Sequence, residues 1–148
     1  MVAKKKKSTT RSDTSLESLS DYIFFLDRAL ESYALRDALT ALGAQVEMHR
    51  DHFDPTADDT TWLPVVASRE WIILSKDQFN WLERRAIIYA KGRAFLLRQG
   101  SLSGAEQVSI ICGALGRILR ILKLTPAPFI AKIYVTRRII VMPKEFRR

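Results

Sequence analysis

The most constraining feature of this sequence is a continuous apolar run, Tyr22 to Leu26, that closes directly on Asp27. A strand exposed on one face alternates apolar and polar residues, so a continuous run indicates a strand covered on both faces, as in a parallel sheet. The segments 44–49, 71–74 and 93–97 are predicted to be further strands. No apolar run approaches the roughly 20 residues that a membrane-spanning helix needs.

Segments with helical spacing lie between these strands. Apolar residues recur every three or four positions, which predicts helices over 29–42, from Asp58 or Asp59 to Ala67, over 78–91 and over 104–124. The segments 130–135 and 139–142 are predicted to pair as a C-terminal β-hairpin. Alternation of strands and helices indicates a three-layer α/β domain, with a mainly parallel central sheet and helices on both faces.

Positive charge is concentrated at the two ends of the chain. The 148 residues carry a net charge of +8 and fit one domain. Residues 1–12 carry five lysines or arginines and no acid, and residues 1–20 are predicted to be a disordered basic arm in front of a domain over 21–148. Basic ends favour phosphate backbones, although the N-terminal run is equally well explained as a solubilising tail.

Cysteine content and the N-terminal pattern bear on the compartment. A single cysteine, Cys112, allows no disulfide within the chain and no cysteine-rich zinc site. The lysine run at the N-terminus is not followed by the apolar stretch of a secretory signal. These features predict a cytoplasmic protein with no membrane association.

Aspartates follow the predicted strands at one edge of the sheet. Asp27 ends the first strand, Asp77 follows the third, and Asp51 lies just beyond the second; Asp59 opens the helix that leads to the third strand. In parallel α/β sheets, ligands bind beyond the carboxyl ends of the strands. Carboxylates gathered there repel one another unless a cation or a proton neutralises them.

Hard oxygen ligands of this kind suit Mg²⁺ or Mn²⁺, and phosphodiester hydrolysis is the natural chemistry of such a site. Two simpler interpretations remain open, because Asp59 and Asp77 could each cap the helix that follows. The residues that flank the acidic edge are predicted to contact a substrate backbone, or else to be ordinary surface groups: Arg28, Arg50, Ser75 and Lys76.

Four segments in a fixed order resemble the PIN-like domain family, and more narrowly its short branch related to VapC toxins. They are Phe24 to Arg28, Asp51 to Phe53, Asp59 to Pro64 and Ile73 to Asp77. Two further segments, 102–106 and 126–131, match the same branch. The resemblance covers about residues 22–135, and it rests on the shared order of these segments together with the 18-residue step from Asp59 to Asp77.

The resemblance implies a metal-dependent endoribonuclease in which Asp27, Asp59 and Asp77 are catalytic and hold Mg²⁺ or Mn²⁺. Asp51 matches an acidic position of the short branch and would be a further metal ligand. Longer members carry a glutamate on an extra helix that this chain lacks. The resemblance also implies RNA as substrate, a toxin role with an antitoxin protein as partner, and a homodimer. The alternative is a non-catalytic module on the same fold that binds nucleic acid or a partner.

Overall fold

The computed structural model describes residues 18–98 and 101–143. The described chain begins with a short 3₁₀ helix, η1 (Ser18–Asp21), in which Leu19 is only 1% exposed and packs into the core. The described structure therefore includes residues 18–20 of the predicted arm, and residues 1–17 lie outside the described residues. In the described ranges, no helix is both long and apolar enough to cross a membrane.

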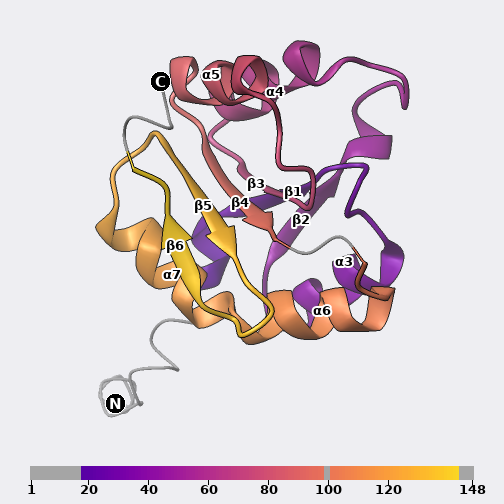
Figure 1. The fold of residues 1–148 in the computed structure, drawn as a ribbon. Helices are drawn as coiled ribbons and strands as arrows, with labels where there is room; N and C mark the ends of the chain where they lie inside the picture. The colour runs from indigo at the N-terminus through magenta and orange to yellow at the C-terminus, as the bar shows by residue number, and fades with distance from the viewer. Residues whose placement is uncertain (1–17, 99–100, 144–148) are drawn as a thin grey trace, which may run out of the picture.

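A six-stranded sheet forms the centre of the domain (Figure 1). Its strands stand in the order β2-β1-β3-β4-β5-β6. The first five are parallel, and β6 pairs antiparallel with β5. This confirms the mainly parallel sheet and the C-terminal hairpin. The bounds are β1 (Ile23–Leu26), β2 (Gln45–Met48), β3 (Ile72–Ser75), β4 (Arg93–Leu97), β5 (Phe129–Ile133) and β6 (Ile139–Val141).

Helices cover both faces of the sheet, as the sequence predicts (Figure 1). One face packs on α3 (Tyr33–Ala41), α6 (Gly104–Gly113) and α7 (Leu115–Leu124), and the other on α4 (Asp59–Ser68) and α5 (Trp81–Tyr89). The neighbours Phe24 and Phe25 are both fully buried but belong to opposite apolar clusters. A strand buried on both sides needs apolar residues at every position, which explains the continuous run that ends at Asp27.

Side-chain caps set the start of several helices. Ser32 accepts a hydrogen bond from the Leu35 N–H, so α3 begins later than the predicted residue 29. Asn80 and Glu83 form a reciprocal capping box at α5, and Phe79 before them has a φ of 55°. The predicted helix over 78–91 therefore begins only at Trp81. A second capping box, with Ser103 as the cap, opens α6 where the sequence indicates it.

The prediction of one continuous helix over 104–124 is wrong, because the chain breaks at Ala114 into α6 and α7. Arg137, from the turn between β5 and β6, lies so close that a β-carbon at Gly113 would collide with it, and its Nη2 donates to Ser109 Oγ. Glycine is a poor helix former. The Ala114 N–H bonds to the carbonyls of both Ile110 and Ile111, as at a helix end.

Candidate acidic active site

The candidate site begins where β1 and β3 end side by side. The Asp27 N–H donates to the Leu74 carbonyl at 3.0 Å, which continues the parallel pairing of β1 with β3 by one residue. Asp27 therefore leaves the sheet beside Ser75 and the loop that carries Asp77. Strand polarity brings Asp27 and Ser75 together although they are 48 positions apart in the sequence.

Asp27 is a buried carboxyl in which only one of the two oxygens accepts a hydrogen bond. It is 1% exposed, and its Oδ2 accepts a hydrogen bond of 2.6 Å from Ser75 Oγ. The Ser75 hydroxyl in turn accepts from the Asp77 N–H at 2.9 Å, which orients its proton toward Asp27. The other oxygen, Oδ1, is buried without a partner among the described residues. A buried carboxylate oxygen without a donor calls for a proton or a cation.

The pKa of Asp27 is raised to about 6. Burial is the largest cause, and it is partly opposed by the hydrogen bond from Ser75 and by the nearby backbone N–H of Arg28. The negative charges of Asp59 and Asp77 raise the pKa further. These three aspartates are therefore close enough to interact electrostatically, and a strongly perturbed carboxyl of this kind is common at functional sites.

Asp59 is held by an arginine rather than used as a helix cap. Its Oδ1 accepts from Arg28 Nη2 at 2.9 Å and from Trp62 Nε1 at 3.0 Å, and its side chain is 10% exposed. Asp58 occupies the cap position of α4 and makes no side-chain cap bond. Arg28 also donates to the Pro55 and Ala57 carbonyls. Arg28, predicted to contact substrate, thus fixes the loop before α4 and neutralises Asp59.

Asp77 and Glu83 lie near Asp27 and Asp59, and these four residues are called the acidic group below. Asp77 is exposed, and its Oδ1 accepts from the Phe79 N–H in a tight turn, so Asn80 rather than Asp77 caps α5. The pKa of Glu83 is raised by burial first, and also by the neighbouring Asp59 and Asp77. We did not predict Glu83 from the sequence. The available signal was the capping-box spacing from Asn80, which places Glu83 in the first helical turn after an aspartate-bearing strand.

The other predicted residues lie around this group in different settings. Asp51 is exposed at the end of η2 (His49–Asp51), and its charge acts on Arg50. Arg50 itself faces Glu31 and bonds the Tyr33 hydroxyl. Lys76 is partly exposed beside Asp77. The interactions in the structure join Asp27, Asp59 and Asp77 with Ser75 and Arg28, and they connect Asp51 and Arg50 to each other.

A buried histidine lies behind the acidic edge. His49 is fully buried, and neither ring nitrogen has a hydrogen-bond partner among the described residues. It packs among the rings of Phe25, Phe53 and Trp62. Burial, together with the charge of Arg28, lowers its pKa. The imidazole is therefore neutral near pH 7 and supports the aromatic core.

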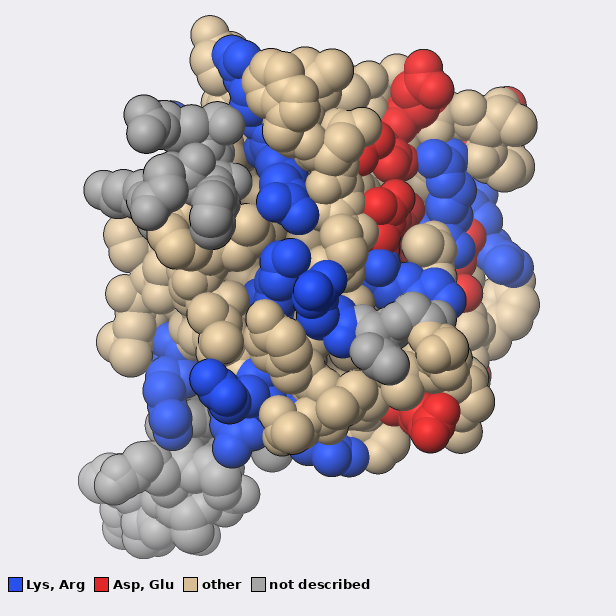
Figure 2. Space-filling model, in the orientation of Figure 1, with Lys and Arg blue, Asp and Glu red and all other residues tan. Residues whose placement is uncertain are grey.

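The acidic group fits a cation only in part as it stands. The unpartnered Asp27 Oδ1 and the mutual repulsion of the carboxyls favour a cation. Arg28, however, already neutralises Asp59. Over residues 18–98 and 101–143, no group of three or more histidine, cysteine, aspartate or glutamate side chains is arranged so that it could hold a metal ion. Figure 2 shows acidic side chains gathered beside a larger group of basic ones on this face.

A three-layer α/β domain with carboxyl groups beyond the carboxyl ends of its parallel strands belongs to the class of α/β proteins that bind ligands at this edge of the sheet. The sequence pattern of the PIN like domain family matches residues 23–99, more than half of the chain. The chain therefore belongs to the PIN-like domain family. The matched segment contains β1 to β4 and all four acidic residues of the group. No curated protein and no solved structure gives a significant match.

Proposed function

We propose that this protein is a metal-dependent endoribonuclease that hydrolyses RNA phosphodiester bonds at the acidic edge. The observation that carries the proposal is Asp27, a buried carboxyl with an unpartnered oxygen and a pKa raised to about 6. A fold does not need such a group, because a buried charge without a partner destabilises the folded state. A proton at low pH or a bound cation near neutral pH would offset this cost.

Asp27, Asp59 and Asp77 would hold Mg²⁺ or Mn²⁺, and Glu83 is a fourth acidic group in reach of their charge. When bound, such an ion activates water and neutralises charge at a scissile phosphate. Ser75 orients Asp27 through the 2.6 Å hydrogen bond. Arg28 holds Asp59 at 2.9 Å, so ion binding competes with this ion pair.

The test compares RNA cleavage by the wild-type protein, Asp27→Asn and Asp77→Asn in the presence of Mn²⁺. Asp37→Asn is the matched control, because Asp37 is an exposed aspartate on α3 whose partner is Arg36. We expect both site variants to lose cleavage and the control to keep it. Equal cleavage by all four proteins would remove the proposal. Calorimetric titration with Mn²⁺ supplies a readout that is independent of activity, and Asp27→Asn should weaken it.

A second function is favoured by the Arg28–Asp59 ion pair. An arginine that permanently replaces the cation would leave a PIN-like module that binds nucleic acid or a partner without cleaving it. Such a module would bind RNA equally well with Mn²⁺ or with a chelator. Metal-dependent cleavage that is lost in Asp27→Asn excludes it.

We also propose, from the resemblance alone, that the protein is the toxin of a toxin–antitoxin pair and has an antitoxin protein as partner. A homodimer is a further proposal on the same ground. Cytoplasmic localisation is a further proposal, and it rests on the single cysteine and the N-terminal sequence pattern. Growth arrest on expression of the wild-type protein, relieved by Asp27→Asn, would support the toxin role.

A further inference from the structure

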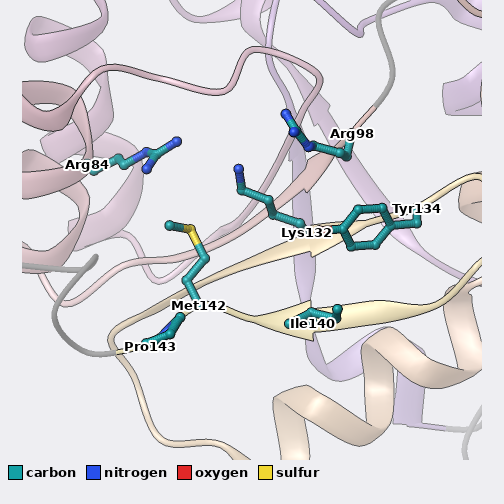
Figure 3. A pocket seen from close by; sticks show the side chains of 7 residues that line it. All are labelled: Arg84, Arg98, Lys132, Tyr134, Ile140, Met142 and Pro143. Atoms are coloured by element: carbon teal, nitrogen blue, oxygen red, sulfur yellow. The ribbon is translucent and has the colours of Figure 1, made fainter.

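A second charged site lies across the sheet from the acidic group. A cavity of about 330 Å³ is lined by Arg84, Arg98, Lys132, Tyr134, Ile140, Met142 and Pro143. Figure 3 shows the nitrogen ends of Arg84, Arg98 and Lys132 directed toward one another. The volume is at the lower end of the range of small-molecule sites, so it suits one nucleotide better than a bare ion.

Sheet register explains why these residues meet. Ser75, Leu96, Lys132 and Ile140 stand in one row across β3, β4, β5 and β6. Leu96 belongs to the apolar cluster under α4 and α5, so Lys132 faces the same side. Side chains two positions apart share a face, which adds Arg98 and Tyr134. The basic residues therefore lie where the cover of α4 and α5 gives way to an exposed part of the sheet.

The three cations have no anionic partner in the part of the chain that the structure describes. None of them belongs to an ion pair there, and Arg84 donates only to the Gln78 carbonyl, at 3.1 and 2.9 Å. Burial, followed by the charges of Arg84 and Arg98, lowers the pKa of Lys132. Like charges held together in a hollow repel one another and favour an anion between them.

The cavity lies on the same face of the sheet as the acidic group and is connected to it through Gln78. Arg84 is anchored on Gln78, the residue after Asp77, and Gln78 Nε2 donates to the Lys76 and Leu97 carbonyls. In the register row, Lys132 is two strands from Ser75, which bonds Asp27. Neighbouring strands are about 4.8 Å apart, so this step is roughly 10 Å. One nucleic-acid strand can therefore contact both sites.

We propose that this cavity binds one nucleotide unit of a single-stranded RNA substrate, with its phosphate between Arg84, Arg98 and Lys132 and its base against Tyr134. The apolar residues Ile140, Met142 and Pro143 form the floor beside the base. Aromatic stacking accepts any base, whereas the cations read only the phosphate. The RNA strand is the substrate of the nuclease proposed above, so the choice of RNA as ligand rests on that proposed function.

The experiment measures fluorescence anisotropy of a labelled single-stranded oligoribonucleotide with the full chain, in EDTA so that no metal-dependent cleavage occurs. Arg98→Glu and Lys132→Gln are the test variants. Arg120→Glu, with the same change of charge as Arg98→Glu, is the control, because Arg120 is exposed on α7 of the other helical layer. We expect at least tenfold weaker binding for both test variants and less than twofold for the control. The dependence on salt should also become shallower, by about 0.7 in log–log slope for each phosphate that the variant no longer neutralises.

Stacking is tested at Tyr134. Tyr134→Phe should bind as the wild type does, and Tyr134→Ala should bind about tenfold more weakly. Equal loss in Arg98→Glu and Arg120→Glu would show diffuse charge attraction and overturn the site. Equal affinity for a duplex of the same sequence, or competition by inorganic phosphate at the concentration of the oligonucleotide, would overturn the single strand as ligand.

The results separate this site from the proposed catalysis. A protein that binds as expected but does not cleave with Mn²⁺ contradicts the nuclease and leaves the basic cavity in place. A protein that cleaves with Mn²⁺ but binds RNA equally well after Arg98→Glu and Lys132→Gln contradicts the cavity alone. Thermal unfolding of each variant checks that the fold is intact.

Discussion

Replacing Asp27 by asparagine is expected to stabilise the protein at pH 8 while removing its proposed activity. The pKa of this carboxyl is raised from 3.8 to about 6 on folding. The folded chain therefore binds the proton more tightly than the unfolded chain. The stability that this proton contributes is complete below pH 3.8 and is lost as the pH rises through about 6. Asparagine has nearly the same shape and no charge at any pH.

The magnitude follows from the pKa shift. A difference of about 2 pKa units corresponds to about 3 kcal/mol of destabilisation by the ionised carboxyl at pH 8. At pH 4.5 only about 1 kcal/mol of it remains, because the carboxyl is protonated in the folded chain. The asparagine carbonyl can still accept from Ser75. Its NH₂ group, however, takes the place of Asp27 Oδ1, which has no hydrogen-bond partner, and this costs stability. That cost is the same at both pH values and cancels in the comparison.

Urea denaturation of wild type and Asp27→Asn at pH 8 and pH 4.5 measures this effect. We expect the advantage of the variant to be about 2 kcal/mol larger at pH 8 than at pH 4.5. Each kcal/mol shifts Tm by about 2–4 °C in a domain of this size, so thermal unfolding detects the same effect. A variant that differs from wild type equally at both pH values would refute the argument that the charge of Asp27 is destabilising.

Three further changes have defined outcomes. Arg28→Lys should lower the unfolding free energy, measured in urea, by about 1–2 kcal/mol, because an ammonium group cannot reach both the carbonyls and the carboxylate that the guanidinium bonds. The control Arg36→Lys, at an exposed ion pair, should change it little. Equal effects of the two substitutions would contradict the structural role of Arg28. Protonation of His49 should destabilise the folded state as the pH falls below 6.5, because its folded pKa is lowered, and His49→Leu should remove this contribution. Identical pH profiles of wild type and His49→Leu by thermal unfolding would count against it. Ser75→Ala should raise the pKa of Asp27 above about 6 by removing its hydrogen bond, and an NMR titration that finds the pKa unchanged or lower would disprove it.

The parts of the fold that depend on local pattern were accessible from the sequence. The run that ends at Asp27 predicts a strand buried on both faces, because neighbouring residues such as Phe24 and Phe25 must face different layers. The Ser103 capping box predicts the start of α6. The break at Ala114 is not predicted, and the residue that packs against Gly113 beside it, Arg137, comes from a distant turn.

For the two sites as well, features that follow from local pattern are predictable, and features that depend on distant residues are not. Strand polarity alone predicts that Asp27 and Asp77 meet at one edge. The ion pair between Arg28 and Asp59 joins residues 31 apart and depends on the path of the loop before α4. The basic cavity depends on the register of β4, β5 and β6, and a shift of one residue would turn Lys132 to the other face. Long-range geometry of this kind leaves no mark on local sequence.

The ion pair between Arg28 and Asp59 also has a consequence for how the chain folds. A guanidinium supplied by the chain itself offsets one of the clustered charges as soon as the loop before α4 closes. The ion pair lowers the charge repulsion that folding must overcome, so we expect this domain to depend less on a bound ion than small domains that fold only around a zinc ion. Folding of the chain and binding of a metal ion would then be separate steps, and the supply of the metal could control activity without affecting folding.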